Sequence, residues 1–322
     1  MRTLFQHGFR SQIVRHLDAL AVRLMFPEDR PNFDFTQPAG ERALVGPDSI
    51  SWRIFKNPVS LVVGGIAAVI LELAEPAVRT GVWEHSSFRT APMRRLQRTG
   101  LAAMITVYGP RSAAEKMIAG VVRRHETVSG TTPAGELYHA NDTPLLDWVQ
   151  ATATFGFAKA YSRYVSPLGR EEFSHLFSEG REAARLYGAV NAPTSLSEWE
   201  RLLESMKKRL ERSPIIFEFL EIMQQAAILP RPFGPLQRIM VRAAVDITPQ
   251  WVRERLGLGS VHGLRTGEDI FLRSVGGVAD EIALPSVPPV QACLRLGLPA
   301  NYLYGNSPGR DRRSMAPAAP RV

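Results

Sequence analysis

Hydrophobic residues recur every three or four positions along most of the chain, which is the spacing of an amphipathic helix. The stretch 59–74 is nearly all apolar and predicts a helix buried on every side. Ser195 and Glu198 form a capping-box pattern at the start of another helix. The predicted helices cover residues 1–25, 59–74, 93–108, 112–128, 142–164, 171–187, 195–210, 214–230, 236–245 and 249–256.

Glycine and proline interrupt this pattern at 31–48, at 129–141 and again from residue 258 onward. Few segments show strand alternation, and no repeat is found along the chain. The pattern therefore predicts one all-α domain over residues 1–305 with a loop-rich C-terminal cap. We expect residues 306–322 to form a disordered basic tail.

The composition is that of a globular protein of 322 residues, with 45% hydrophobic and 22% charged residues. The longest uncharged apolar stretch, 59–71, is shorter than the roughly 20 residues that a membrane-spanning helix needs. The single cysteine, Cys293, excludes an internal disulfide framework and a Cys-cluster metal site. Residues 1–25 lack the apolar region and cleavage site of a signal peptide, so we expect a cytoplasmic protein.

The net charge of +8 raises the question of nucleic acid or an anionic membrane as a partner. Basic residues are spread along the chain rather than gathered in one patch, so we expect no nucleic-acid partner. The predicted N-terminal helix mixes arginines with Phe5, Phe9 and several leucines. It fits a helix packed on the domain, and it also fits peripheral contact with a membrane surface. The oligomeric state is not indicated.

Most catalytic motifs are missing from the sequence. It has no Walker loop, no nucleophile elbow and no complete dinucleotide-binding or zinc-protease motif, and its seven histidines form no pair at helical metal-ligand spacing. A site with one histidine remains open, because a porphyrin supplies four of the iron ligands itself. Such a cofactor needs one axial histidine, a wide apolar slot and cations for its propionates.

His125 is the histidine best placed for that role. It projects from the apolar stripe of the predicted helix 112–128, where it is either a core histidine bonded to a carbonyl or a neutral imidazole bound to iron. On the preceding helix, Arg95 and Thr99 share a face and Arg98 lies next to them. These arginines are either solvated surface cations or partners of a propionate or another anion.

Ten short pieces of the sequence, taken in order, resemble the MpaB-type oxygenase family, which includes the rubber oxygenases or latex-clearing proteins. The resemblance is strong over about residues 47–165 and weaker to about residue 258. The pieces are 47–53 (PDSISWR), 76–78 (PAV), 81–82 (GV), 84–88 (EHSSF), 95–96 (RL), 98–99 (RT), 108–109 (YG), 128–130 (VSG), 138–142 (YHAND) and 145–149 (LLDWV).

The resemblance implies a helical, globin-like core that holds haem b, with His125 on the iron. It implies that Arg95 and Thr99 match the Arg-x-x-x-Thr pair of the family near the haem. Where rubber oxygenases carry a lysine that can reach the iron, this chain has Arg98, which does not lose its proton to become a ligand. The chemistry implied is oxidation with O₂.

The sequence departs from the family pattern at three places. Gln150 and Glu75 stand where members often have histidine, and Val122 stands where they often have arginine. Gln150 can still donate a hydrogen bond to a cofactor. Glu84 and His85 are candidate acid and base groups or a polar helix end, and Tyr138 either packs in the core or donates a hydrogen bond near the cofactor.

Together these features predict a haem b-dependent oxygenase or oxidase that acts with O₂ on an apolar small molecule. The alternatives are a haem-dependent oxidase or dehydrogenase of a small metabolite without oxygen insertion, and a haem-free helical scaffold or binding protein.

Overall fold

The computed structural model describes residues 2–26 and 33–304. Helices make up 66% of the chain, which confirms the all-α prediction, and the described ranges contain one small antiparallel hairpin. The predicted tail 306–322 lies outside the described residues. The hairpin joins β1 (Ser129–Thr131) to β2 (Leu137–His139), with Gly130 opposite Tyr138.

Helices of very different length follow one another along the chain. The α-helices are α1 (Arg2–Met25), α2 (Ile50–Phe55), α3 (Pro58–Ala74), α4 (Pro76–His85), α5 (Pro92–Tyr108), α6 (Arg111–His125), α7 (Thr143–Tyr164), α8 (Arg170–Glu179), α9 (Arg181–Tyr187), α10 (Leu196–Ser205), α11 (Pro214–Gln225), α12 (Gly234–Ile247), α13 (Gln250–Leu256), α14 (Glu268–Asp280) and α15 (Pro288–Arg295). Short 3₁₀ turns lie at Met206–Lys208, Arg231–Phe233 and Ser260–His262.

The structure differs from the sequence prediction mainly at prolines and glycines. Pro76 was expected only to end a helix, but it occupies the first turn of α4, with the Glu75 side chain as the cap. The predicted helix 171–187 is broken at Gly180 into α8 and α9. The expected loop-rich cap contains α14 and α15, and α15 again begins with a proline.

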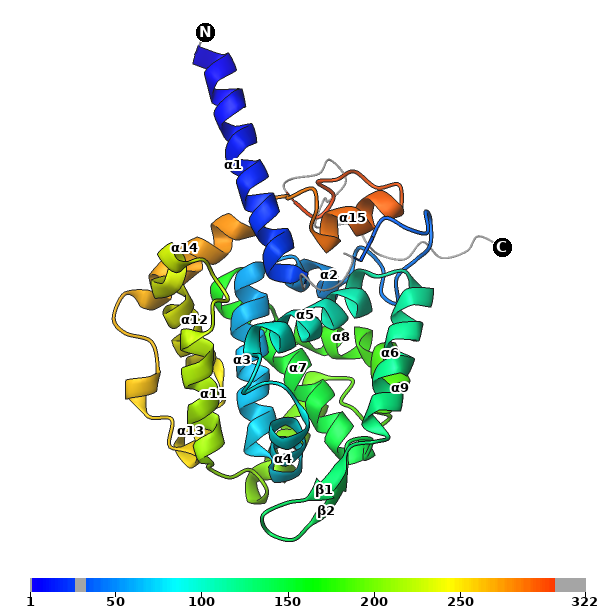
Figure 1. Ribbon diagram of the computed structural model, residues 1–322, viewed down its shortest axis with the longest axis vertical. Helices are drawn as coiled ribbons and strands as arrows, with labels where there is room; N and C mark the ends of the chain where they lie inside the picture. The colour runs from blue at the N-terminus through cyan, green and yellow to red at the C-terminus, as the bar shows by residue number, and fades with distance from the viewer. Residues whose placement is uncertain (1, 27–32, 305–322) are drawn as a thin grey trace.

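The centre of the molecule is the contact between α3 and α7, which run side by side (Figure 1). Gly64 on α3 and Gly156 on α7 make this close approach feasible. A Cβ atom at Gly64 would lie 2.7 Å from the Cα of Phe157, and one at Gly156 would press on the carbonyl of Gly64. Helices α11 to α13 flank one side of this pair, and α6 and α9 flank the other (Figure 1).

The ring stack beside α7 forms part of the largest core cluster. Trp199 stacks on Trp148 and Phe155, and the Trp148 indole donates to the Leu71 carbonyl at 3.2 Å. The bond fixes α7 on α3.

A second core cluster joins the N-terminal loop, α5, α6 and the C-terminal region. The Arg295 guanidinium is buried and donates to the carbonyls of Phe35, Glu41 and Tyr108 at 2.7 to 2.8 Å. One side chain therefore joins three segments that are far apart in the sequence.

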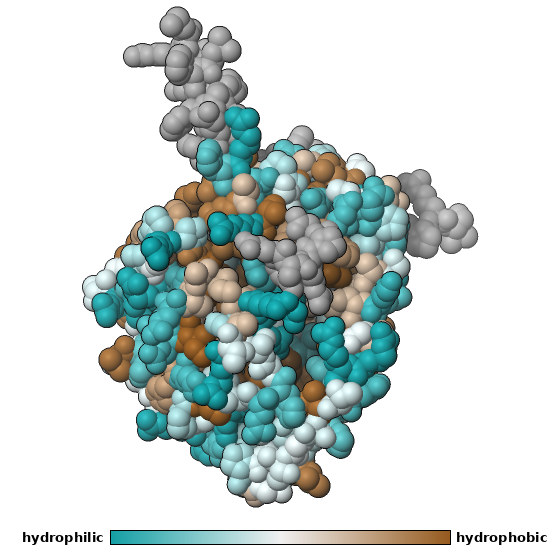
Figure 2. Space-filling model, viewed as in Figure 1, coloured by the Kyte–Doolittle hydropathy of each residue, from teal (hydrophilic) through white to brown (hydrophobic). Residues whose placement is uncertain are grey.

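The predicted N-terminal helix is confirmed as α1, whose first half projects from the body (Figure 1). Its second half is held by the body, because Asp18 accepts two hydrogen bonds from Ser286 and the Gln97 amide donates to the Arg23 carbonyl. Figure 2 shows hydrophobic residues where α1 meets the body, and hydrophobic and hydrophilic residues interspersed over the rest of this face.

No single helix in residues 2–26 and 33–304 is long and apolar enough to cross a membrane. The pair α3 and α4, bent by 110°, passes the same test together on length and composition. Most of α3 is buried against its neighbours, as expected for a central core helix.

Candidate functional site

His125 is the last residue of α6, and its side chain is half-buried. Its Nδ1 atom is buried and has no hydrogen-bond partner within the described ranges. Burial lowers the pKa of His125 below its ordinary value of 6.5, and the Arg95 charge lowers it further, whereas Asn141 opposes the shift. The imidazole is therefore neutral at pH 7, which is the form that binds a metal.

Arg95 and Thr99 on α5 contact each other, as the sequence spacing predicts. The Arg95 Nη1 atom donates to the Thr99 Oγ1 atom at 2.6 Å, and the Thr99 hydroxyl donates to the Arg95 carbonyl at 2.9 Å. Burial lowers the pKa of Arg95, and the neighbouring Arg98 lowers it too, while the charge of Glu72 raises it. Arg98 also has a buried Nε atom without a hydrogen bond in the described part of the chain.

Glu72 is a member of this cluster that sequence reasoning missed. Burial raises the pKa of this α3 carboxyl from 4.5 to about 7, although the Arg95 charge and the Thr152 hydroxyl lower it. The carboxyl is therefore close to half-protonated at neutral pH. A signal was present, since Glu72 is the only charged residue in the apolar stretch 59–74.

The structure thus brings together groups from four helices. Glu72 of α3, Arg95 of α5 and His125 of α6 are coupled through Arg95, and Thr152 of α7 lies against Glu72. We call Glu72, Arg95 and His125 the charge cluster. It combines a neutral imidazole, a half-protonated carboxyl and a half-buried cation.

Within the described ranges, Glu84 and His85 make no hydrogen bond or ion pair to the charge cluster. Both are exposed at the end of α4. The Tyr138 side chain fills a slot between Gly81 and Gly130. A Cβ added at Gly81 would lie 3.3 Å from the ring, and one added at Gly130 would lie 2.7 Å from the hydroxyl oxygen. Its hydroxyl is buried and makes no hydrogen bond within the described residues, and burial raises its pKa together with the charge of Glu84.

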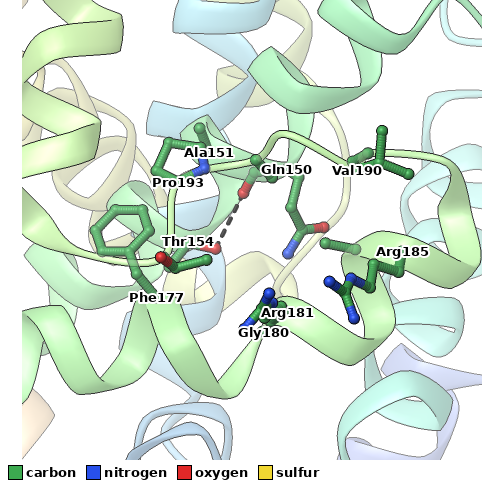
Figure 3. A pocket seen from close by; sticks show the side chains of 13 residues that line it. Gln150, Ala151, Thr154, Phe177, Gly180, Arg181, Arg185, Val190 and Pro193 are labelled. Atoms are coloured by element: carbon green, nitrogen blue, oxygen red, sulfur yellow. Dashed lines mark hydrogen bonds between the residues drawn. The ribbon is translucent and has the colours of Figure 1, made fainter.

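Gln150 lies on another side of α7, in a pocket of about 440 Å³ that is open to solvent. It is two residues from Thr152, and two residues turn a helix by about 200°. The pocket is formed by α7, the ends of α8 and α9 and residues 189–194. Figure 3 shows the Gln150 amide extending toward Arg181 and Arg185, while the Thr154 hydroxyl donates to the Gln150 carbonyl at 3.0 Å. The structure therefore does not bring Gln150 to the charge cluster.

The other two departures from the family pattern have structural roles. Glu75 is fully buried, caps α4 through the Val78 amide at 2.6 Å and pairs with Arg209 at 2.6 Å. Val122 packs in the second core cluster, and its carbonyl accepts a hydrogen bond from Asn141.

Residues 52–279 match the family model described as ER-bound oxygenase mpaB/B'/rubber oxygenase, catalytic domain. The chain belongs to this family. Membership in the MpaB/rubber oxygenase family implies an oxygenase, and hence an enzyme that uses O₂ and a substrate. No curated protein and no solved structure matches the chain.

The whole charge cluster lies inside the region matched by the MpaB/rubber oxygenase family. Within residues 2–26 and 33–304, no group of three or more His, Cys, Asp or Glu side chains is arranged to hold a metal ion. His125 remains the candidate for a cofactor that requires a single protein ligand.

Proposed function

We propose that this protein is a haem b-dependent oxygenase that acts with O₂ on an apolar small molecule, with His125 on the iron and the helices around it forming a globin-like core. The observation that carries the proposal is a neutral, half-buried imidazole beside half-buried cations, within the region matched by an oxygenase family. The identity of the substrate stays open.

The residues present fit such a cofactor. The buried Nδ1 atom of His125 makes no hydrogen bond to a backbone carbonyl in the described part of the chain, so the ring is not held as a core histidine on the main chain. Arg95 and Arg98 supply the cations that propionates need, and the buried Nε atom of Arg98 is available for a hydrogen bond. The apolar length of α3 helps to exclude water from the same region.

Haem, when bound, supplies the oxygen chemistry. The protein residues bind, orient and move protons around it. His125 offers a neutral nitrogen, and Arg95 places a positive charge next to it. The Glu72 carboxyl, with a pKa of about 7, holds a proton or releases it near physiological pH, which suits a general acid or base.

The test is a hemin titration of the purified protein, followed by visible absorption. We expect stoichiometric uptake with a strong Soret band in the wild type and no such band in His125→Ala. His139→Ala is the matched control, because His139 is an exposed histidine of the hairpin. A folded wild type that takes up no haem would overturn the cofactor assignment and leave the scaffold function as the alternative.

The reaction itself is tested with ¹⁸O₂ on the haem-loaded protein and a panel of apolar substrates. Label in the product supports an oxygenase. Substrate oxidation with all label recovered in water or peroxide would instead support the alternative oxidase.

A further inference from the structure

Asn141 lies next to the end of α6 and is held there firmly. Its Nδ2 atom donates to the Val122 carbonyl at 3.1 Å, which ties the side chain to the last turn of α6. The Ala140 amide donates to the Val128 carbonyl at 2.9 Å and fixes the backbone immediately before it. Asn141 therefore has both a fixed position and a fixed amide orientation.

Two buried polar atoms lack a partner at this place. The His125 Nδ1 and Asn141 Oδ1 atoms are both buried, and neither makes a standard hydrogen bond within the described ranges. The Asn141 side chain nevertheless acts on the imidazole, because it is the group that raises the pKa of His125 by hydrogen bonding. Two adjacent orphan atoms are best satisfied by each other.

The chemistry of the two atoms decides which way the proton lies. An amide oxygen only accepts hydrogen bonds, so a bare Nδ1 lone pair would face another lone pair, whereas an Nδ1–H group would donate to it. Flipping the amide would turn its oxygen toward the Val122 carbonyl and lose the existing bond. Arg95 and Arg124 also act on the ring, but guanidinium groups have no acceptor atom.

We propose that Asn141 is a positioning residue that accepts the Nδ1–H proton of His125 and holds the neutral ring with its Nε2 lone pair free. A ring fixed in this way presents a single ligand atom in one orientation. That the ligand faces iron rests on the proposed function, whereas the tautomer is a property of the protein without cofactor.

The tautomer is measured first, by ¹⁵N NMR of histidine-labelled protein without haem at a pH where His125 is neutral. We expect the Nδ1–H form to predominate in the wild type. Asn141→Leu replaces the acceptor by an apolar side chain of similar size. Because one hydrogen bond is lost, we expect the ratio of the Nε2–H to the Nδ1–H tautomer to rise by about threefold to tenfold. Asn141→Asp keeps an acceptor and retains the Nδ1–H form. Asn301→Leu, at an exposed asparagine, is the control and leaves the ratio unchanged.

The second readout uses haem-loaded protein. We expect a lower iron–histidine stretching frequency in Asn141→Leu and a higher one in Asn141→Asp, and haem loss from Asn141→Leu faster by about 10- to 100-fold. Predominance of Nε2–H in the wild type overturns the proposal even if Asn141→Leu fails to fold. An unchanged ratio in a folded Asn141→Leu also overturns it, even if haem binds at His125. The expected tautomers without any haem uptake would support the role of Asn141 and overturn only the proposed function.

Discussion

Charged residues on the two sides of α7 differ in their exposure to solvent. On the side of Thr152, Glu72 and Arg95 are half-buried together, and the loss of solvent shifts the pKa of both. On the side of Gln150, Arg181 and Arg185 are exposed at the rim of an open pocket. Polar residues two positions apart on one helix thus enter different environments. Only the first side has the low-dielectric surroundings that adjust protonation for chemistry.

The largest expected effect is on the free energy of unfolding, and it comes from forcing α7 away from α3, which disrupts the packing on both sides of α7. In Gly156→Val the new side chain meets the Gly64 carbonyl and the Ala68 backbone, so we expect a loss in free energy of unfolding of about 3 kcal/mol. Urea unfolding followed by circular dichroism measures it. Gly65→Ala is the control, because its Cβ makes only an ordinary 3.8 Å contact with Phe157 and improves helix propensity by up to about 1 kcal/mol. Equal stability of Gly156→Val and wild type would contradict this close packing.

The second effect tests whether Glu72 is as buried as the comparison requires. Its pKa is raised from 4.5 to about 7 on folding, so the folded protein keeps a proton that the unfolded chain loses. The free energy of unfolding therefore decreases by on the order of 2 kcal/mol as the pH rises from about 4.5 to 7, and it is level above pH 7.

Glu72→Gln removes this part of the pH dependence and gains stability at pH 8 relative to pH 4. Unfolding curves at both pH values measure the difference, with exposed Glu126→Gln as the control. A slope between pH 4.5 and 7 that is the same in Glu72→Gln and wild type would show that Glu72 is solvated.

The third effect distinguishes the two sides by haem affinity. Arg95→Gln removes a half-buried cation beside His125, and we expect haem affinity to fall about tenfold, as for the loss of one charge-assisted hydrogen bond. Gln150→Ala acts on the open pocket and leaves affinity within about twofold of the wild type. Hemin titration by fluorescence quenching measures both. A larger loss in Gln150→Ala than in Arg95→Gln would reverse the comparison and place the cofactor against Gln150.

The smallest expected effect tests whether the Tyr138 hydroxyl lies near the charge cluster and its cofactor. Its buried hydroxyl has no partner in the described ranges, so Tyr138→Phe is expected to change the free energy of unfolding by less than about 1 kcal/mol, in the stabilising direction. Tyr108→Phe is the matched contrast, because the Tyr108 hydroxyl donates to the Trp52 carbonyl at 2.8 Å. That variant loses about 1 kcal/mol. A marked loss of haem affinity in Tyr138→Phe would instead assign its hydroxyl to the cofactor.

The sequence predicted long helices better than their interruptions. Residues 142–164 were expected to be helical and α7 covers Thr143–Tyr164, because hydrophobic periodicity over many turns is a strong signal. Proline was ambiguous, since it both ends helices and begins them, and so α4 was missed. Asp142 directly precedes α7, and its side chain accepts a hydrogen bond from the His139 amide rather than capping the helix.

The candidate site was predictable only in part. The contact of Arg95 with Thr99 follows from helical spacing alone, because both lie on one helix. The meeting of Glu72 with Arg95 depends on how α3 packs against α5, and the sequence shows only an isolated charge in an apolar stretch. Gln150 was placed with the cofactor by resemblance, and its direction depends on the rotation of α7, which no local pattern determines.

The three hydrogen bonds of Arg295 show that the region matched by the family model is smaller than the unit that folds. The family match ends at residue 279, yet Arg295 reaches back to the Tyr108 carbonyl inside the matched region and to Phe35 and Glu41 before it. A fragment trimmed to residues 52–279 would lack Phe35, Glu41 and Arg295, and it would leave the Tyr108 carbonyl at the end of α5 without the guanidinium that binds it. The useful boundaries for expression, deletion and fusion therefore lie outside the matched catalytic region, where both flanks of the chain close over the same helix.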